Sequence, residues 1–187
     1  MEKMNIDFKK TALVLIDLQK GIVASHGGGE VVEKATELVE LFHQNQGFIV
    51  FVNVAFHDGK DMLKPITDKP ALSQKTPDDW AELDPRLDIR KSDYRLTKRQ
   101  WGAFFGTDLD LQLRRRGMDT IVLCGISTNR GVESTAREAY QFGYNQIFVE
   151  DAMKAHSEEE HRASVRFVFP QLGRVRRAAD LIGQTNQ

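Results

Sequence analysis

Thr11-Ala-Leu-Val-Leu-Ile-Asp17 is a short, continuous run of mostly branched apolar residues that ends in a carboxylate. A strand with one face in water alternates apolar and polar residues, whereas a strand covered on both faces is apolar throughout. The run therefore predicts a buried strand of a parallel sheet. Asp17 then lies at the carboxyl end of that strand, partly removed from water.

The rest of the chain repeats this pattern in alternation with helical segments. Buried strands are expected over residues 48–56, 119–124 and 146–150, with a short strand over 174–176. Helices are expected over residues 30–46, 107–117, 132–142, 157–169 and 178–182. Strands that alternate with helices imply right-handed crossovers, so we expect an α/β fold whose mainly parallel sheet is covered on both faces.

Length and composition limit the class of protein. A chain of 187 residues fits one domain, so residues 1–187 are expected to form a single domain. The net charge is -1, which provides no overall field for nucleic acid or an anionic membrane. The single cysteine excludes an internal disulfide or a thiolate cluster. The charged N-terminus resembles no signal peptide and no apolar run reaches about 20 residues, so we expect a cytoplasmic protein without a membrane span.

Ligands of such sheets bind beyond the carboxyl ends of the strands. Burial there would raise the pKa of Asp17, and a nearby cation would lower it again. Capping a helix or binding the following loop is an equally good explanation of this carboxylate. Lys98 lies in a basic run, which by itself favours a solvated face. The segment Trp101–Gly106 after it suits a pocket wall or the edge of a core.

A second candidate ligand-binding segment lies between the strand that ends at Gly125 and the helix that begins near Gly131. Ser127, Thr128 or Asn129 can each cap this helix. The backbone N–H groups of residues 129–132 would then face the sheet edge and offer donors to an anion or an oxyanion. From the spacing alone, an ordinary strand–loop–helix connection is the better interpretation.

Three segments taken together resemble the isochorismatase-like hydrolase family. They are Leu15–Gln19, Lys98–Asp108 and Gly125–Arg137, and the resemblance extends over about residues 11–182. It implies a three-layer, Rossmann-like α/β/α sandwich with about six strands. Most members use an aspartate, a lysine and a cysteine, and the resemblance places the first two on Asp17 and Lys98. Gly131 occupies the position of the cysteine.

This departure changes the chemistry that the resemblance implies. Gly131 supplies no nucleophile, so the thioester route of the amidase members is disfavoured. Cys124 lies within the strand, where a buried structural thiol is expected. Isochorismatases of this family lack the cysteine and hydrolyse an enol ether, which releases pyruvate. By this resemblance Asp17 is the general acid, Lys98 holds substrate charge or tunes Asp17, and the backbone at Ser127 and Gly131 orients the ligand. The alternative is a catalytically silent protein that binds a small molecule or acts as a scaffold.

Further expectations concern the rest of the site. Arg130 either binds a carboxylate of a small-molecule substrate or pairs across a subunit interface. The resemblance also implies a cis peptide at Ile126–Ser127 and a homo-oligomer, a dimer or larger, in which residues 57–97 complete a neighbour's site. We expect no metal and no cofactor. His26, His43, His156 and His161 are expected to be structural or solvated. The candidate substrate contacts are Gln19, Trp101, Phe104, Asn129 and Arg130.

Overall fold

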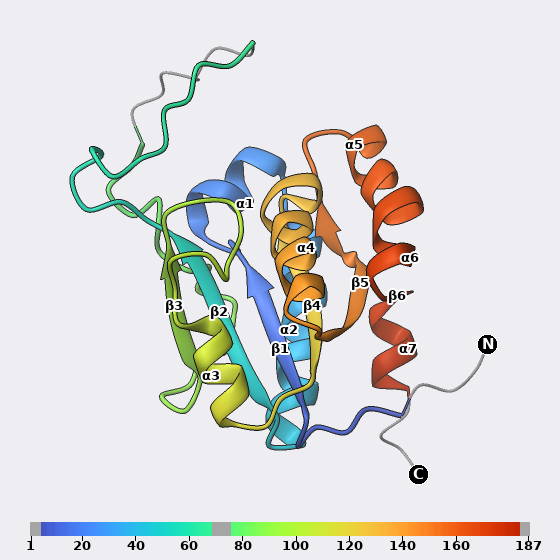
Figure 1. The fold of residues 1–187 in the computed structure, drawn as a ribbon. Coiled ribbons are helices and arrows are strands. Elements are labelled where there is room, and N and C mark those ends of the chain that lie inside the picture. Colours follow the sequence, from blue (N-terminus) through green and yellow to red (C-terminus); the bar gives the residue numbers. More distant parts are fainter. Residues whose placement is uncertain (1–4, 69–75, 184–187) are drawn as a thin grey trace.

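A six-stranded parallel sheet forms the centre of the computed structural model, which describes residues 5–68 and 76–183 (Figure 1). The strands lie in the order β3-β2-β1-β4-β5-β6, and every neighbouring pair is parallel. This confirms the predicted fold class. The strands are β1 (Thr11–Ile16), β2 (Phe48–Val54), β3 (Tyr94–Lys98), β4 (Thr120–Ile126), β5 (Asn145–Lys154) and β6 (Arg174–Arg176).

Helices cover both faces of this sheet, as Figure 1 shows. Side chains of α1, α2 and α7 pack in the core on one face, and side chains of α3, α4 and α6 pack in the core on the other. Two π-helical turns lie in the second half of the chain: η1 (Thr128–Val132) directly before α4, and η2 (Ser164–Val168) between α5 and α6. The helices are α1 (Lys20–His26), α2 (Gly29–Gln44), α3 (Leu109–Arg115), α4 (Glu133–Gln141), α5 (Glu158–Ala163), α6 (Phe169–Leu172) and α7 (Ala178–Ile182).

The burial of strand β1 on both faces explains why its sequence is apolar throughout. All six of its residues are buried. Leu13 and Leu15 contribute to the core on the α2 side, while Val14 and Ile16 contribute to the core on the α4 side. Successive side chains of a strand point to opposite faces, so a strand between two helical layers needs apolar residues at every position.

Two elements were not predicted from the sequence. Strand β3 lies at the sheet edge, where Leu96 and Lys98 are buried and Arg95 and Thr97 are exposed. Such alternation is typical of a strand with one exposed face, but this run has only five residues and a lysine at one of its buried positions, so it lacks the continuous apolar pattern of the central strands. Helix α1 has only seven residues, of which Val23 alone is buried, so it carries little periodic signal. The helix expected over 157–169 is divided into α5, η2 and the start of α6.

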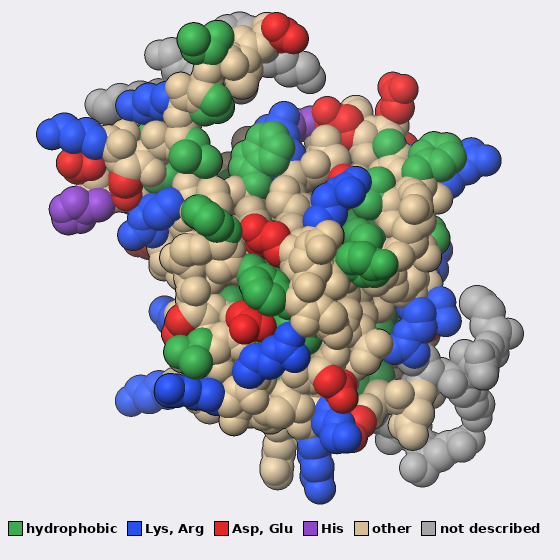
Figure 2. All heavy atoms as spheres, viewed as in Figure 1, with side chains coloured by type: hydrophobic (Ala, Val, Ile, Leu, Met, Phe, Trp, Pro, Cys, Tyr) green, Lys and Arg blue, Asp and Glu red, His purple; other side chains and the backbone are tan. Residues whose placement is uncertain are grey.

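The segment after β2 projects away from the body of the molecule (Figure 1). We call its described part, residues 57–68, the arm. Leu63 and Ile66 are exposed on it, and Figure 2 shows hydrophobic side chains along its surface. Within residues 5–68 and 76–183, no helix has the length and apolarity needed to cross a membrane.

Candidate active site

Asp17 directly follows β1, where the strand order changes direction. The chain goes from β1 to β2 on one side and later returns to β4 on the other side of β1. Such a switch point leaves a crevice at the carboxyl ends of the strands. Asp17 adopts a left-handed backbone with φ 52°, and its N–H donates to the Val52 carbonyl at 2.9 Å. This turn directs the chain away from the sheet at the crevice.

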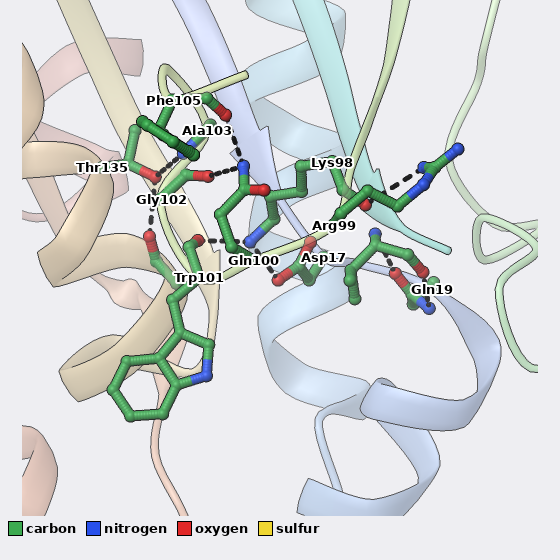
Figure 3. Close-up of polar contacts among 12 residues, drawn as sticks. Asp17, Gln19, Lys98, Arg99, Gln100, Trp101, Gly102, Ala103, Phe105 and Thr135 are labelled. Atoms are coloured by element: carbon green, nitrogen blue, oxygen red, sulfur yellow. Dashed lines mark hydrogen bonds and ion pairs between the residues drawn. The ribbon is translucent and has the colours of Figure 1, made fainter. Parts of the chain in front are cut away.

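The structure brings Asp17 and Lys98 together, although they lie 81 positions apart in the sequence. Lys98 Nζ lies 2.8 Å from Asp17 Oδ2, and the two side chains are only 1% and 7% exposed. The same ammonium donates to the Trp101 carbonyl, as Figure 3 shows. Lys98 is the last residue of β3, so the strand that the sequence did not predict is the element that positions it.

The Asp17 carboxyl keeps its proton to a higher pH than an ordinary aspartate. Burial raises its pKa from 3.8 to about 6, although the charge of Lys98 acts in the opposite direction. Its Oδ1 is buried and has no hydrogen-bond partner among the described residues. The site therefore combines one carboxylate oxygen paired with a cation and one oxygen free to interact with a ligand.

Gly131 lies beside this pair. A Cβ atom built on Gly131 would lie 3.0 Å from Asp17 Oδ2 and 3.3 Å from Lys98 Nζ. A side chain at position 131 would therefore contact both charged groups. The single cysteine of the chain, Cys124, is fully buried in β4, and burial raises its thiol pKa to about 12.

Hydrogen bonds fix the loop after Lys98 to the turn that contains Gly131. The Thr135 hydroxyl donates to the Gly131 carbonyl at 2.7 Å and accepts from the Ala103 N–H at 3.1 Å. Thr135 is fully buried on α4. Figure 3 shows Thr135 bonded to Ala103 on the loop that follows Lys98. The relative positions of Lys98 and Gly131 therefore depend on α4.

A cavity of about 340 Å³ opens over the pair. Its walls come from the ends of β1, β2, β3 and β4, from α1, from η1 and from the arm. Its lining combines apolar side chains with a few charged ones, which is typical of a small-molecule site. The lining residues are Asp17, Ile22, His26, Val54, Phe56, Met62, Leu63, Trp80, Lys98, Arg99, Gln100, Trp101, Ile126, Ser127, Arg130 and Gly131.

Two of the five candidate substrate contacts line this cavity, Trp101 and Arg130. The Arg130 guanidinium carbon lies 5.8 Å from the centre of the Trp101 ring, and no carboxylate among the described residues pairs with it. A ligand with a negative charge would thus find a cation beside an aromatic wall.

The structure places the other three contacts elsewhere. The Gln19 side chain is fully buried and bonds to the backbone of Val54 and Trp80. Phe104 lies in the core against α4, and the side-chain Oδ1 of Asn129 accepts a hydrogen bond from the Ser127 hydroxyl. Residues that are close in sequence, such as Trp101 and Phe104, therefore face the cavity in one case and the core in the other.

The turn between β4 and α4 differs in part from the expectation. The expected cis peptide at Ile126–Ser127 is confirmed. The N–H groups of Arg130 and Val132, expected to be free for a ligand, both donate to the Ser127 carbonyl at 3.2 Å. The hypothesis of free donors at residues 129–132 is therefore wrong for these two, because the π-helical turn satisfies them internally, as in the ordinary connection that the spacing favours.

Sequence reasoning missed several lining residues. Met62 and Leu63 belong to the arm, which has no periodic pattern. His26 was expected to be structural or solvated, yet it lines the cavity from the end of α1. No sequence signal marks these residues, because only the return of the chain to the carboxyl edge places them there. In residues 5–68 and 76–183 no group of three or more His, Cys, Asp or Glu side chains forms a metal-binding cluster.

Comparisons with known proteins agree with this architecture. The family profile described as "Isochorismatase domain" matches residues 11–180. The "Uncharacterized isochorismatase family protein YwoC" of Bacillus subtilis is 62% identical over 98% of each chain. The structure of an isochorismatase family protein from Burkholderia thailandensis has a TM-score of 0.88 and 44% identity, and the match covers 94% of this chain and 96% of that one.

More distant relatives have a stated activity. The "Ureidoacrylate amidohydrolase RutB" of Acinetobacter baylyi is 30% identical, and the match covers 88% of this chain and 68% of that protein. Its name refers to the hydrolysis of an amide. The matching proteins thus differ in how far their chemistry is known.

Proposed function

The chain belongs to the isochorismatase family, and we propose that it hydrolyses a small carboxylated molecule without a covalent cysteine intermediate. The reaction is enol-ether hydrolysis of the isochorismatase type. One observation carries the proposal. Asp17, with a pKa of about 6, lies next to Lys98, and the residue beside both of them is Gly131, which has no side chain. An acid is available, whereas a nucleophilic side chain at position 131 is not.

The proposed reaction begins with proton transfer. Asp17, in its protonated form, gives its proton to the terminal vinyl carbon of the enol ether, which becomes a methyl group. The adjacent carbon becomes an oxocarbenium ion. Water adds to this carbon and returns a proton to Asp17. The resulting hemiketal then breaks its bond to the alcohol oxygen, and the proton of the hemiketal hydroxyl passes to that oxygen, which yields pyruvate and the free alcohol.

The neighbouring groups support this route. Lys98 Nζ lies 2.8 Å from Asp17 Oδ2, which accepts a hydrogen bond whether the carboxyl is ionised or protonated on Oδ1, so Lys98 holds the carboxyl in place while Oδ1 remains free for the ligand. Burial outweighs the cation and keeps the pKa of Asp17 high enough for the acid role. Arg130 offers a charge-assisted partner for the carboxylate of the substrate.

Amide hydrolysis through a thioester needs a thiolate next to these groups. Cys124 is buried within β4 and burial raises its pKa to about 12, which suppresses the thiolate. A relative that is an amidohydrolase therefore does not by itself favour that activity here. We propose enol-ether hydrolysis as the leading function on this ground.

The test offers isochorismate and a panel of simple amides to the wild type and to Asp17→Asn, and measures pyruvate and ammonia. The proposal expects pyruvate from isochorismate, a loss of at least about 100-fold in Asp17→Asn, and no ammonia. The matched control is Asp119→Asn, an exposed aspartate that precedes β4 at the opposite edge of the sheet, which should retain full activity.

Other outcomes would contradict the proposal in distinct ways. Ammonia release by the wild type would indicate an amidase. Ligand binding without turnover of any compound would favour the silent binding protein. A companion variant, Gly131→Cys, places a thiol beside Lys98 and should gain slow ammonia release from amides. An inert thiol there would contradict the assigned geometry of the third position.

A further inference from the structure

His26 lines the cavity, contacts its own helix through one ring nitrogen and leaves the other without a hydrogen-bond partner among the described residues. It is the last residue of α1, and its Nδ1 lies 2.9 Å from the Ile22 carbonyl oxygen, one turn earlier. The Ser25 hydroxyl also lies 3.0 Å from Nδ1, but it donates to the same Ile22 carbonyl oxygen, and a carbonyl oxygen only accepts hydrogen bonds, so this arrangement favours the proton on Nδ1. In the neutral ring, Nε2 then holds a lone pair and acts as an acceptor.

This acceptor has no hydrogen-bond partner in the described part of the chain. Nε2 of His26 is buried, and no described residue forms a hydrogen bond with it. A buried polar atom without a partner is uncommon in folded proteins and calls for an explanation. Because Nδ1 turns back to α1, Nε2 is the polar atom that His26 can offer to the cavity that it lines.

The surroundings hold this ring in place and keep it neutral. The ring of His156 stacks on it, with centroids 3.8 Å apart and an angle of 20°. Burial lowers the pKa of His26, and the nearby charges of His156 and Arg130 lower it further. The Ile22 carbonyl and Glu160 act in the opposite direction, and the pKa as a whole is lowered. A neutral ring keeps the Nε2 lone pair available at neutral pH.

Arg130 lines the same cavity with a cation that no described carboxylate pairs. The cavity therefore offers a donor for an anion at Arg130, an acceptor at His26 and an aromatic wall at Trp101. A complementary ligand carries a carboxylate, an apolar ring or chain, and a hydrogen-bond donor such as a hydroxyl group.

We infer that His26 is a specificity-determining residue, whose Nε2 accepts a hydrogen bond from a hydroxyl or N–H group of the carboxylated ligand. The inference rests on the proposed function for the carboxylate and adds the second group that the ligand must carry. A ligand without that donor leaves Nε2 buried and unpaired. We expect it to bind roughly tenfold to hundredfold more weakly.

Equilibrium binding of simple probes tests the inference without any turnover. The probes are benzoate, the three hydroxybenzoates and the three methoxybenzoates, which share the ring and the carboxylate. The methoxy compounds keep the oxygen but lack the donor hydrogen. For at least one ring position, we expect the hydroxy compound to bind at least about tenfold more tightly than both benzoate and its methoxy counterpart.

Variants then assign this preference to His26. His26→Asn keeps an N–H group for the Ile22 carbonyl but removes the acceptor at the depth of Nε2, so the preference should disappear. His26→Gln returns an acceptor at that depth and should restore part of it. The control, Asp119→Asn, changes an exposed aspartate that precedes β4 at the opposite edge of the sheet and should keep the preference. Melting temperatures of all three variants report whether they fold.

Three outcomes would overturn the inference: equal binding of hydroxy and parent benzoates, a preference that survives in His26→Asn, or no binding of any probe. Failure of the proposed function has a different signature. A wild type that binds with the expected preference but releases no pyruvate from isochorismate would contradict the proposed reaction and support the role of His26.

Discussion

A Cβ atom at Gly131 would lie 3.0 Å from Oδ2 of Asp17, so the absence of a side chain at one position creates the free space at the other. The same Cβ would lie 2.9 Å from Ile16 Cγ2. A side chain at position 131, on the turn after β4, would therefore press on the Asp17 carboxyl and reduce the space of the cavity above it.

Gly131→Ala should fold but lose turnover. The backbone of Gly131 is outside the left-handed region, so alanine is tolerated conformationally, while its methyl group would press on Asp17 and Ile16. We expect kcat for pyruvate release to fall at least about tenfold. The control is Gly29→Ala, whose Cβ would lie 3.7 Å from an Arg86 nitrogen, an ordinary contact. Full activity of the Gly131 variant would show that this space is not needed.

The pH profile of kcat/KM should report the acid role of Asp17. A general acid acts in its protonated form, and Asp17 has a pKa of about 6. Activity should therefore fall as the pH rises through about 6, by about tenfold for each further pH unit. Initial rates between about pH 5 and about pH 8 check this. A profile without this decline would argue against Asp17 as the proton donor.

Folding stability should depend on pH in the same range. The pKa of Asp17 is raised in the folded protein, from 3.8 to about 6, so the folded state binds more protons than the unfolded state between these values. The contribution of Asp17 to stability therefore falls as the pH rises from about 4 to about 7, by roughly 2 kcal/mol in total. Urea unfolding of the wild type and of Asp17→Asn at both pH values measures the difference, which should be smaller in the variant.

Arg130→Ala should weaken substrate binding more than turnover. The guanidinium has no carboxylate partner among the described residues, so its removal breaks no internal ion pair. We expect KM for a carboxylated substrate to rise about 10- to 100-fold. Arg137→Ala is the control, since that arginine pairs with Glu133 on α4. An unchanged KM together with an altered elution volume in size-exclusion chromatography would assign Arg130 to a subunit interface instead.

Gln19→Ala should destabilise the protein without removing a ligand contact. The Gln19 amide donates to the carbonyls of Val54 and Trp80 and accepts from the Val54 N–H. Its loss leaves buried backbone groups unpaired, at a cost of about 2–4 kcal/mol. Thermal unfolding measures this loss, and KM should remain near the wild-type value. A large rise in KM without loss of stability would return Gln19 to the substrate site.

Much of the fold follows from local sequence patterns. The apolar run of β1 predicts a strand between two helical layers, and the structure confirms it. Helix α2 appears in its periodic apolar residues, and the capping box at Ser157 marks the start of α5. Such signals survive in a single sequence because burial on one or both faces imposes them residue by residue. Strand β3 lies at an edge and carries a weaker pattern.

Some features of the candidate site also follow from the sequence, whereas others depend on the tertiary structure. The sequence by itself determined that Asp17 ends a buried strand, and its resemblance to a family added Lys98 and Gly131 as the groups beside it. Only the tertiary structure decided that the carboxyl of Asp17 keeps a raised pKa beside a cation, that Gln19 faces the backbone and that His26 faces the cavity. Solvation and side-chain direction depend on neighbours brought together from distant parts of the chain, and no local pattern of residues records them.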